Sequence, residues 1–233
     1  KGTPEASKMM TLWVYNEKDV AVTHEAFIAL RAEVEQKDQL ETYRHTMRLL
    51  KPLLYMASRG IKANMGELQR TRKILATEKN HLQTKLNLLA GKTINPNSPK
   101  QLIKYFYGDH NIAPYKNRKT GKASVDDNAL KRLARPTTNR RAFPEASIVR
   151  QIRSLAKLIG TYLNIAFDED TRLRCSINPV GTKNGRLSTG QTIFGTGTNM
   201  QNLPMQFKRF LEADKDGLFI EIDKAQGEWV ISA

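Results

Sequence analysis

The chain has little of what stabilises small secreted domains and little of what anchors a protein in a bilayer. Its 233 residues include a single cysteine, Cys175, so an intrachain disulfide is excluded and a reducing, intracellular setting fits best. Its longest uncharged run, residues 187–207, is rich in Gly, Thr, Asn and Gln, whose polar groups would be unsatisfied in lipid. The sequence therefore predicts a cytoplasmic protein with no transmembrane segment and no signal peptide.

Acidic residues are also scarce. The chain has 23 Asp and Glu against 38 Lys and Arg, which gives a formal net charge of +15. With 39% hydrophobic and 26% charged residues, it has enough apolar material for a packed core and is not a disordered basic tail. The charge indicates a polyanionic partner. Because the chain lacks an initiator Met and stops within an apolar run, we expect it to be a piece of a larger protein.

The first two thirds of the chain show helical periodicity. Apolar residues recur every three or four positions over residues 20–59, which predicts one or two amphipathic helices with Pro52 as the one breaker. Leucines seven apart over residues 61–91 predict a helix of about 28 residues, roughly 42 Å long. Arg72 and Lys79 occupy seam positions of this repeat, so a helix packed on a neighbour is favoured over a coiled coil.

A basic segment follows a turn-rich one. Ser98 and Pro99 suit the N-cap and first position of a helix over residues 100–106. Residues 115–141 contain nine Lys and Arg against two Asp, with Thr120-Gly121 as a turn, which indicates a basic hairpin-like tip. Apolar spacing over residues 148–166 predicts another helix.

The period changes from 3.6 to 2 near Thr171. Residues 171–177 and 218–223 then alternate as strands do, with Leu218, Ile220 and Ile222 expected to face inward. A mostly helical body followed by the start of a sheet predicts an α+β fold.

Two kinds of chemistry-bearing residues follow. Asp223 ends the second predicted strand, where a carboxylate can bridge divalent cations that neutralise phosphate oxygens, and Glu228 follows five residues later. The residues alone leave two alternatives open, an Asp that only begins a turn and a role for Glu221 as a ligand. Amide-rich residues 184–189 and 199–204 suit base edges and sugars, and they equally suit exposed loops.

Taken in order, these segments resemble the family A DNA polymerases. Gly185–Ser188 is similar to the family's G-R-L-S element, and Asn199–Pro204 is similar to its N-L-Q-N-I-P element. Asp223–Glu228 falls on the A motif, D-Y-S-Q-I-E. Asn95–Leu102 resembles the thumb element N-x-N-S-P-K-Q-L, and Lys119–Asp126 resembles the K-T-G-x-S-T-D thumb tip.

The resemblance implies a DNA-directed DNA polymerase that transfers deoxynucleotides to a primer 3′-hydroxyl with Mg²⁺. It implies Asp223 as the catalytic metal ligand, and Gln226 and Glu228 as nucleotide-binding residues, with Glu228 excluding a 2′-hydroxyl. The partners it implies are primer–template DNA and deoxynucleoside triphosphates, and we expect a monomer apart from replication partners. The DNA-binding residues it implies are Arg186, Gln201, Asn202, Ser98, Lys100, Lys119, Lys122 and Lys208.

The same resemblance implies three regions. Residues 1–50 would be the end of a 3′–5′ exonuclease-like domain and a connecting helix, with Tyr15–Asp19 as the last exonuclease motif and Asp19 as a remnant metal ligand. Residues 51–168 would be a helical thumb, and residues 169–233 the beginning of the palm. We expect this fragment alone to be inactive, because the family's second metal-binding carboxylate and its finger helix follow the A motif.

Some residues depart from the family. Lys224, Gly227, Trp229 and Val230 replace the family's residues in the A motif, and residues 189–198 are longer than in bacterial enzymes, with three glycines. These departures suggest a divergent, phage-like member. Two other interpretations remain open, a non-catalytic basic helical DNA-binding module and a remnant of a 3′–5′ exonuclease.

Overall fold

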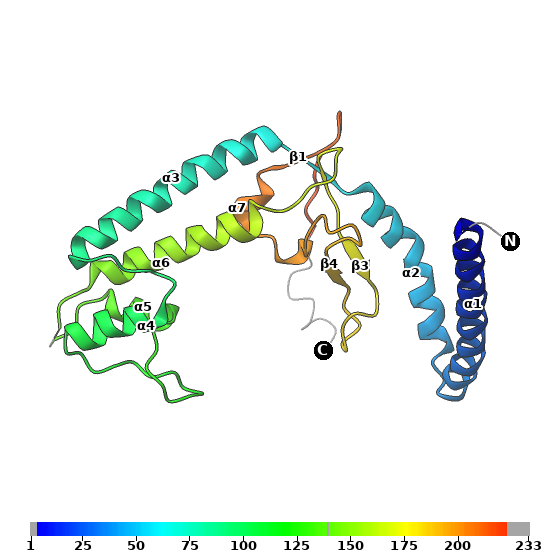
Figure 1. Cartoon of the computed structure of the whole chain (residues 1–233), viewed down its shortest axis with the longest axis horizontal. Coiled ribbons are helices and arrows are strands. Elements are labelled where there is room, and N and C mark those ends of the chain that lie inside the picture. Colours follow the sequence, from blue (N-terminus) through cyan, green and yellow to red (C-terminus); the bar gives the residue numbers. More distant parts are fainter. Residues whose placement is uncertain (1–3, 139, 223–233) are drawn as a thin grey trace. The chain divides into compact units, whose positions relative to one another are not determined.

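The computed structural model describes residues 4–138 and 140–222, with the elements in the order drawn in Figure 1. The chain divides into two compact units. One contains Lys1–Ser58 and Ile177–Ser188, and the other contains Arg59–Ser176 and Thr189–Ala233. Helices dominate and the strands are short, so the predicted α+β class is confirmed.

The first unit begins with two helices, as predicted, although the first is longer than expected. These are α1 (Pro4–Gln36) and α2 (Leu40–Arg59). Pro52 lies inside α2 and does not end it. Pro52 is exposed, so water is available to the backbone groups that a proline leaves unpaired.

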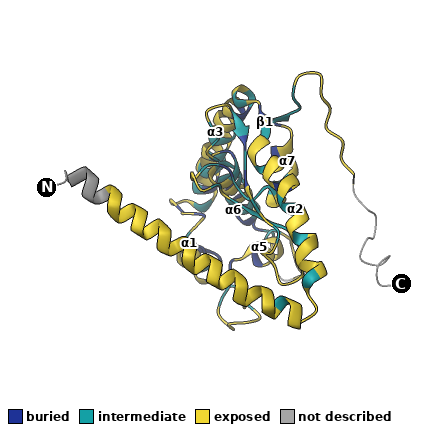
Figure 2. Cartoon of the chain, turned by 90° about the vertical axis from the view of Figure 1, so that its right-hand side faces the viewer, coloured by how far each residue is buried: buried dark blue, intermediate teal, exposed yellow. Residues whose placement is uncertain are grey.

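The amphipathic prediction holds for α2 and is wrong for α1. Figure 2 shows α1 almost entirely in the colour of exposed residues. The large apolar side chains of Phe27, Ile28 and Leu30 are among the exposed ones. Within residues 4–138 and 140–222, no helix has both the length and the apolar character needed to cross a bilayer.

Two long helices form the frame of the second unit. They are α3 (Met65–Ala90) and α6 (Pro144–Lys157), which pack along each other (Figure 1). The α3 end at Gly91 and its packing on a neighbour are confirmed. The predicted start is wrong, because residues 61–63 form a strand and the Asn64 side chain caps α3, accepting the Glu67 N–H at 2.9 Å.

A first hydrophobic core lies between the C-terminal half of α3 and α6. It includes α4 (Pro99–Ile103), which continues into a π-helical turn (Lys104–Asp109), and α5 (Asp127–Leu133). A second π-helical turn (Leu158–Tyr162) extends α6. The largest fully buried side chains of this core are those of Leu86, Leu102, Phe106, Leu130, Leu133 and Val149.

A small antiparallel sheet lies at the start of α3. Its order is β2 (Arg172–Leu173), β1 (Ile61–Ala63) and β5 (Leu211–Glu212). A second core of Leu68, Leu163, Leu173, Phe207 and Phe210 packs beside it. A separate pair is β3 (Ser176–Asn178) with β4 (Ser188–Gly190), followed by a 3₁₀ turn (Met200–Asn202) and α7 (Met205–Lys208).

Both predicted strands differ from the structure. Residues 171–177 do alternate, with Leu173 and Cys175 buried, but the strand is interrupted because its two halves pair with different partners, β2 with β1 and β3 with β4. Residues 218–222 form no strand. Leu218, Ile220 and Ile222 are exposed rather than inward, because no strand among the described residues offers them a hydrogen-bonding partner.

Candidate nucleic-acid interface

The turn before α4 is held by its own amide side chains. The Asn95 side chain accepts the Asn97 N–H at 2.9 Å, and the Gln101 side chain accepts the Asn95 N–H at 2.7 Å. Ser98 caps α4 as predicted, with its hydroxyl oxygen accepting the Gln101 N–H at 3.4 Å. Lys100 in the first turn is exposed. The Ser98 hydroxyl is therefore occupied by the helix, and the Lys100 ammonium faces solvent.

The hairpin-like structure predicted over residues 115–141 is confirmed only for residues 115–124, hereafter the basic tip, because Asp127–Leu133 form helix α5 instead. Lys116 and Ala123 make an antiparallel bridge, and the Asn117 N–H donates to the Lys122 carbonyl at 2.8 Å. The Asn117 side chain also accepts the Lys119 N–H at 2.9 Å, which fixes the turn. Lys119 and Lys122 are both exposed. Lys119 and Lys122, together with the exposed Lys116 and Arg118, therefore project from a hairpin whose backbone is hydrogen-bonded.

The basic tip is attached to the rest of its unit through the buried Tyr107 and the half-buried Arg153. The Tyr107 hydroxyl donates to the Ser124 carbonyl at 2.6 Å, and burial raises the pKa of Tyr107 to about 12. From α6, Arg153 donates to the Val125 carbonyl at 2.8 Å and to the Pro96 carbonyl at 2.7 Å. Burial lowers the pKa of Arg153. One guanidinium thus joins Val125, the residue directly after the basic tip, to the turn before α4.

The amide-rich segment 199–204 folds around one side chain. The Asn199 carboxamide oxygen accepts the Gln201 N–H at 3.1 Å and the Thr189 hydroxyl at 2.7 Å. Gln201 and Asn202 are exposed. The arrangement leaves these two amide side chains on the surface of the second unit, where base edges or sugars could be contacted.

Arg186 belongs to the other unit. It follows a turn in which the Gly185 N–H donates to the Thr182 carbonyl at 3.3 Å, and the Thr182 hydroxyl donates to the Arg186 carbonyl at 2.8 Å. The Arg186 side chain is exposed. Arg186 and the other predicted DNA-binding residues therefore belong to different units.

Lys208 and Glu221 form an ion pair. The Lys208 ammonium lies 3.0 Å from a Glu221 carboxylate oxygen, with both side chains largely in solvent. This pairing bears on two sequence-based hypotheses. It offers a partner other than DNA to Lys208 and a partner other than a metal to Glu221.

The predicted catalytic carboxylate is not among the described residues. Asp223, Gln226 and Glu228 all lie outside residues 4–138 and 140–222. In the described part, no group of three or more His, Cys, Asp or Glu is arranged to hold a metal ion. Asp19, the predicted exonuclease remnant, lies on the exposed surface of α1. The structure therefore leaves both metal-ligand hypotheses as predictions.

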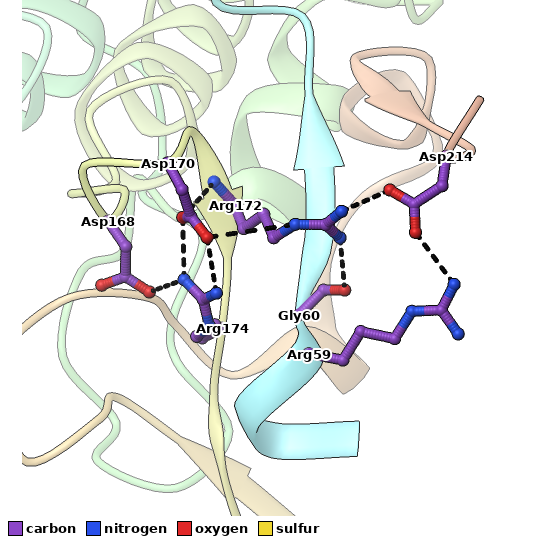
Figure 3. A network of polar contacts seen from close by, with 7 residues as sticks. All are labelled: Arg59, Gly60, Asp168, Asp170, Arg172, Arg174 and Asp214. Atoms are coloured by element: carbon purple, nitrogen blue, oxygen red, sulfur yellow. Dashed lines mark hydrogen bonds and ion pairs between the residues drawn. The ribbon is translucent and has the colours of Figure 1, made fainter. Parts of the chain in front are cut away.

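Sequence reasoning missed an ion-pair network beside the sheet, drawn in Figure 3. Arg172 of β2 pairs with Asp214 and donates to the Gly60 carbonyl at 3.3 Å. Arg59 holds the other Asp214 oxygen at 2.8 Å. Hydrogen bonds from Arg59 and Arg172 hold the pKa of Asp214 below its usual range. The network ties β2, the entry to β1 and the segment after β5 to one another.

A second part of this network surrounds Arg174. Its guanidinium makes two bonds to Asp170, at 2.8 and 2.6 Å, and one to Asp168 at 2.6 Å (Figure 3). The Arg174 bond lowers the pKa of Asp170 to about 2, and bonds from Thr196 and Arg174 lower the pKa of Asp168. The period-2 pattern of residues 171–177 places Arg172 and Arg174 on the same, solvent-facing side of a strand, which is the one sequence feature that pointed to this network. The acidic partners of the two arginines are not identifiable from sequence spacing.

Comparison with known proteins identifies the family to which this sequence is similar. A model of DNA polymerase family A matches residues 65–233. DNA polymerase I of Bacillus subtilis (strain 168) is 28% identical over 208 residues, covering 84% of this chain and 22% of that protein. The thermostable DNA polymerase I of Thermus filiformis is 28% identical over 191 residues, covering 77% of this chain and 22% of that protein. The chain thus spans about a fifth of these relatives.

A solved structure is also similar. It is the POL domain of Pol1 from M. smegmatis in complex with DNA primer–template and dNTP, with a TM-score of 0.55 and 26% sequence identity. The match covers 68% of this chain and 27% of that one. With the family model matching most of its length, the chain belongs to DNA polymerase family A.

Proposed function

We propose that the protein carrying this chain is a DNA-directed DNA polymerase that extends a primer 3′-hydroxyl on a template. In this proposal residues 51–168 act as the thumb and residues 169–233 as the start of the palm, while residues 1–50 end an exonuclease-like domain. The observation that carries the proposal is the family match over residues 65–233. The similar M. smegmatis domain, which binds primer–template and dNTP, supports the same substrates here.

The grip on DNA is assigned to three exposed elements. The start of α4 supplies Lys100, the basic tip supplies Lys119 and Lys122, and the 199–204 segment supplies Gln201 and Asn202. Lysines neutralise phosphates irrespective of sequence, whereas amides reach base edges and sugars. Ser98 would act by capping α4, while Arg186 and Lys208 would add cationic contacts.

Binding of the metal ion and of the incoming nucleotide is assigned to residues of the A motif. Asp223 would hold Mg²⁺, which stabilises the charge on the attacking and leaving oxygens when bound. Gln226 and Glu228 would contact the incoming nucleotide, with Glu228 beneath its sugar. Glu221 is the described carboxylate nearest in sequence to Asp223, and its pairing with Lys208 favours Asp223 as the ligand.

Primer extension by the full-length protein tests the proposal. Asp223→Asn should abolish Mg²⁺-dependent incorporation and leave primer–template affinity within about twofold, because the lost interaction is with charge that develops in the transition state. Asp216→Asn is the matched control, since Asp216 is an exposed carboxylate seven residues earlier.

Two results would contradict the proposal in different ways. Full incorporation by Asp223→Asn would remove Asp223 from the catalytic role. DNA binding without any incorporation by the unchanged protein would favour the non-catalytic binding module instead.

A further inference from the structure

Residues 191–197, hereafter the apolar loop, expose two large hydrophobic side chains at their tip. Ile193 is 91% exposed and Phe194 is 83% exposed. Turn tips usually hold Gly, Asn, Asp or Ser, and adjacent exposed Ile and Phe gain nothing from burial in the folded chain. Such a pair is explained best by a contact with another molecule.

The apolar loop is a closed hairpin. The Thr192 N–H donates to the Thr196 carbonyl at 2.9 Å, and the two hydroxyls lie 2.8 Å apart. The Gly195 N–H donates to the Thr192 carbonyl at 3.1 Å, and Gly195 has a φ of +77°. A tight turn followed by a left-handed glycine is a common three-residue hairpin connection. The backbone therefore presents Ile193 and Phe194 in one arrangement.

The base of the apolar loop is fixed to the second unit. The Gly197 N–H donates to the Ala166 carbonyl at 2.7 Å, and a Cβ at Gly197 would lie 1.8 Å from the Arg174 carbonyl oxygen. Only glycine permits this approach. A hydrogen bond from Thr196 also lowers the pKa of Asp168. Ordering the loop thus costs little when a ligand binds, which favours affinity.

The position of the apolar loop indicates its ligand. Thr189, just before the loop, donates to the Asn199 side chain, which also accepts the Gln201 N–H just after it. The loop therefore rises from the amide segment assigned to primer–template. It also lies within the uncharged run 187–207, so it has no cation with which to bind phosphate. An aromatic ring and an aliphatic side chain suit the faces of bases.

We propose that Phe194 stacks on an exposed base of the primer–template, with Ile193 packing against the same base or its neighbour. This inference rests on the proposed function, because it assumes that the second unit binds DNA. The site takes an accessible base face, so the single-stranded template next to the primer end is its substrate rather than the paired duplex. Stacking is tolerant of sequence, as template-directed synthesis requires.

Equilibrium binding of the full-length protein to a fluorescent primer–template with a single-stranded template overhang tests this. Phe194→Ala should weaken binding about 5- to 150-fold, the range for loss of one stacked base. The slope of log K against log[salt] should not change, because stacking releases no counterions. Phe194→Trp should restore affinity. Met205→Ala, another large exposed apolar residue of the second unit, is the control and should bind normally.

The outcomes separate this inference from the proposed function. If the unchanged protein binds no DNA, the proposed function fails. If it binds DNA and Phe194→Ala binds equally well, or loses the same affinity on a blunt duplex, the base contact is wrong. A change of oligomeric state in Phe194→Ala without a change in DNA affinity would instead assign the tip to a second copy of the chain. An unaltered thermal transition is expected in every variant, since Phe194 packs against little in the fold.

Discussion

Arg153 shows how one side chain can position two surface elements. Its guanidinium donates hydrogen bonds to two backbone carbonyls, those of Pro96 and Val125, which belong to different loops. Arg150, one turn earlier on α6, instead pairs with the exposed carboxylate of Asp127 at 2.6 Å. The two arginines therefore differ in role although they share a helix.

Replacing Arg153 should loosen the basic tip. Hydrogen bonds from a charged donor contribute about 1.5–3 kcal/mol each, so loss of the bond to the Val125 carbonyl in Arg153→Met should lower the local opening free energy around Ser124 and Ala129 by about 1.5–3 kcal/mol. Arg150→Met removes only a surface ion pair and should cost less than about 1 kcal/mol. Hydrogen exchange of the Ser124 and Ala129 amides measures both. Equal protection in the two variants would show that Arg153 does not anchor the basic tip.

The carboxylate of Asp170 makes the stability of the folded chain decrease at low pH. Its pKa is about 2 in the folded chain because of Arg174, against about 4 in an unfolded chain. Its stabilising contribution is therefore complete above about pH 4 and is lost as the pH falls toward 2. Thermal unfolding from pH 5 to pH 2 should show a smaller acid-induced loss in Arg174→Gln than in the unchanged protein. An identical loss would assign the acid sensitivity to other carboxylates.

At the scale of elements, the start of α4 separates a structural role of Ser98 from a binding one. Ser98→Ala should destabilise the first turn by about 1 kcal/mol, whereas Ser98→Asp keeps the cap and suits the helix dipole. The Gln101 amide should therefore be less protected from hydrogen exchange in Ser98→Ala than in Ser98→Asp. Primer–template affinity should fall more in Ser98→Asp, because the new charge repels phosphate. If affinity instead tracks helix protection, phosphate does not approach this helix start.

Helices were predictable where their ends are coded locally. Ser98 with Pro99 and the Gly91 end of α3 lie next to the elements that they delimit, so short-range rules located them. Strands were less predictable because pairing partners lie far along the chain. β1 pairs with residues more than a hundred positions away, and the helical period of residues 61–91 concealed it.

The candidate site also contains features that were predictable from local sequence and features that were not. The basic tip was identified from its charge and its turn, and its hairpin geometry is confirmed. The partners of Arg172, Arg174 and Arg153 were not predictable, because each contact depends on tertiary packing. The pairing of Lys208 with Glu221 had no sequence signal either. The catalytic role of Asp223 was predicted from the family resemblance. The local sequence pattern does not establish that role, and Asp223 lies outside the described residues.

At the scale of the whole molecule, the net charge of +15 raises the question of whether DNA binding depends on total charge or on its placement. If about four to six phosphates are contacted, log K should fall with log[salt] with a slope of roughly −4 to −5. Replacing Lys119 and Lys122 together by Gln should make that slope shallower by about 2, since each phosphate contact contributes about 0.9.

The matched control is the pair Lys51→Gln and Lys215→Gln, two exposed lysines outside the basic tip. Both double variants lower the net charge by the same amount, so long-range attraction falls equally in each. A phosphate contact acts only where its counterion is displaced, and the slope should therefore respond to the tip pair and not to the control. Salt titrations of binding to one primer–template measure both slopes. If the two slopes shift equally, charge placement is irrelevant and the basic tip is not a phosphate-binding element.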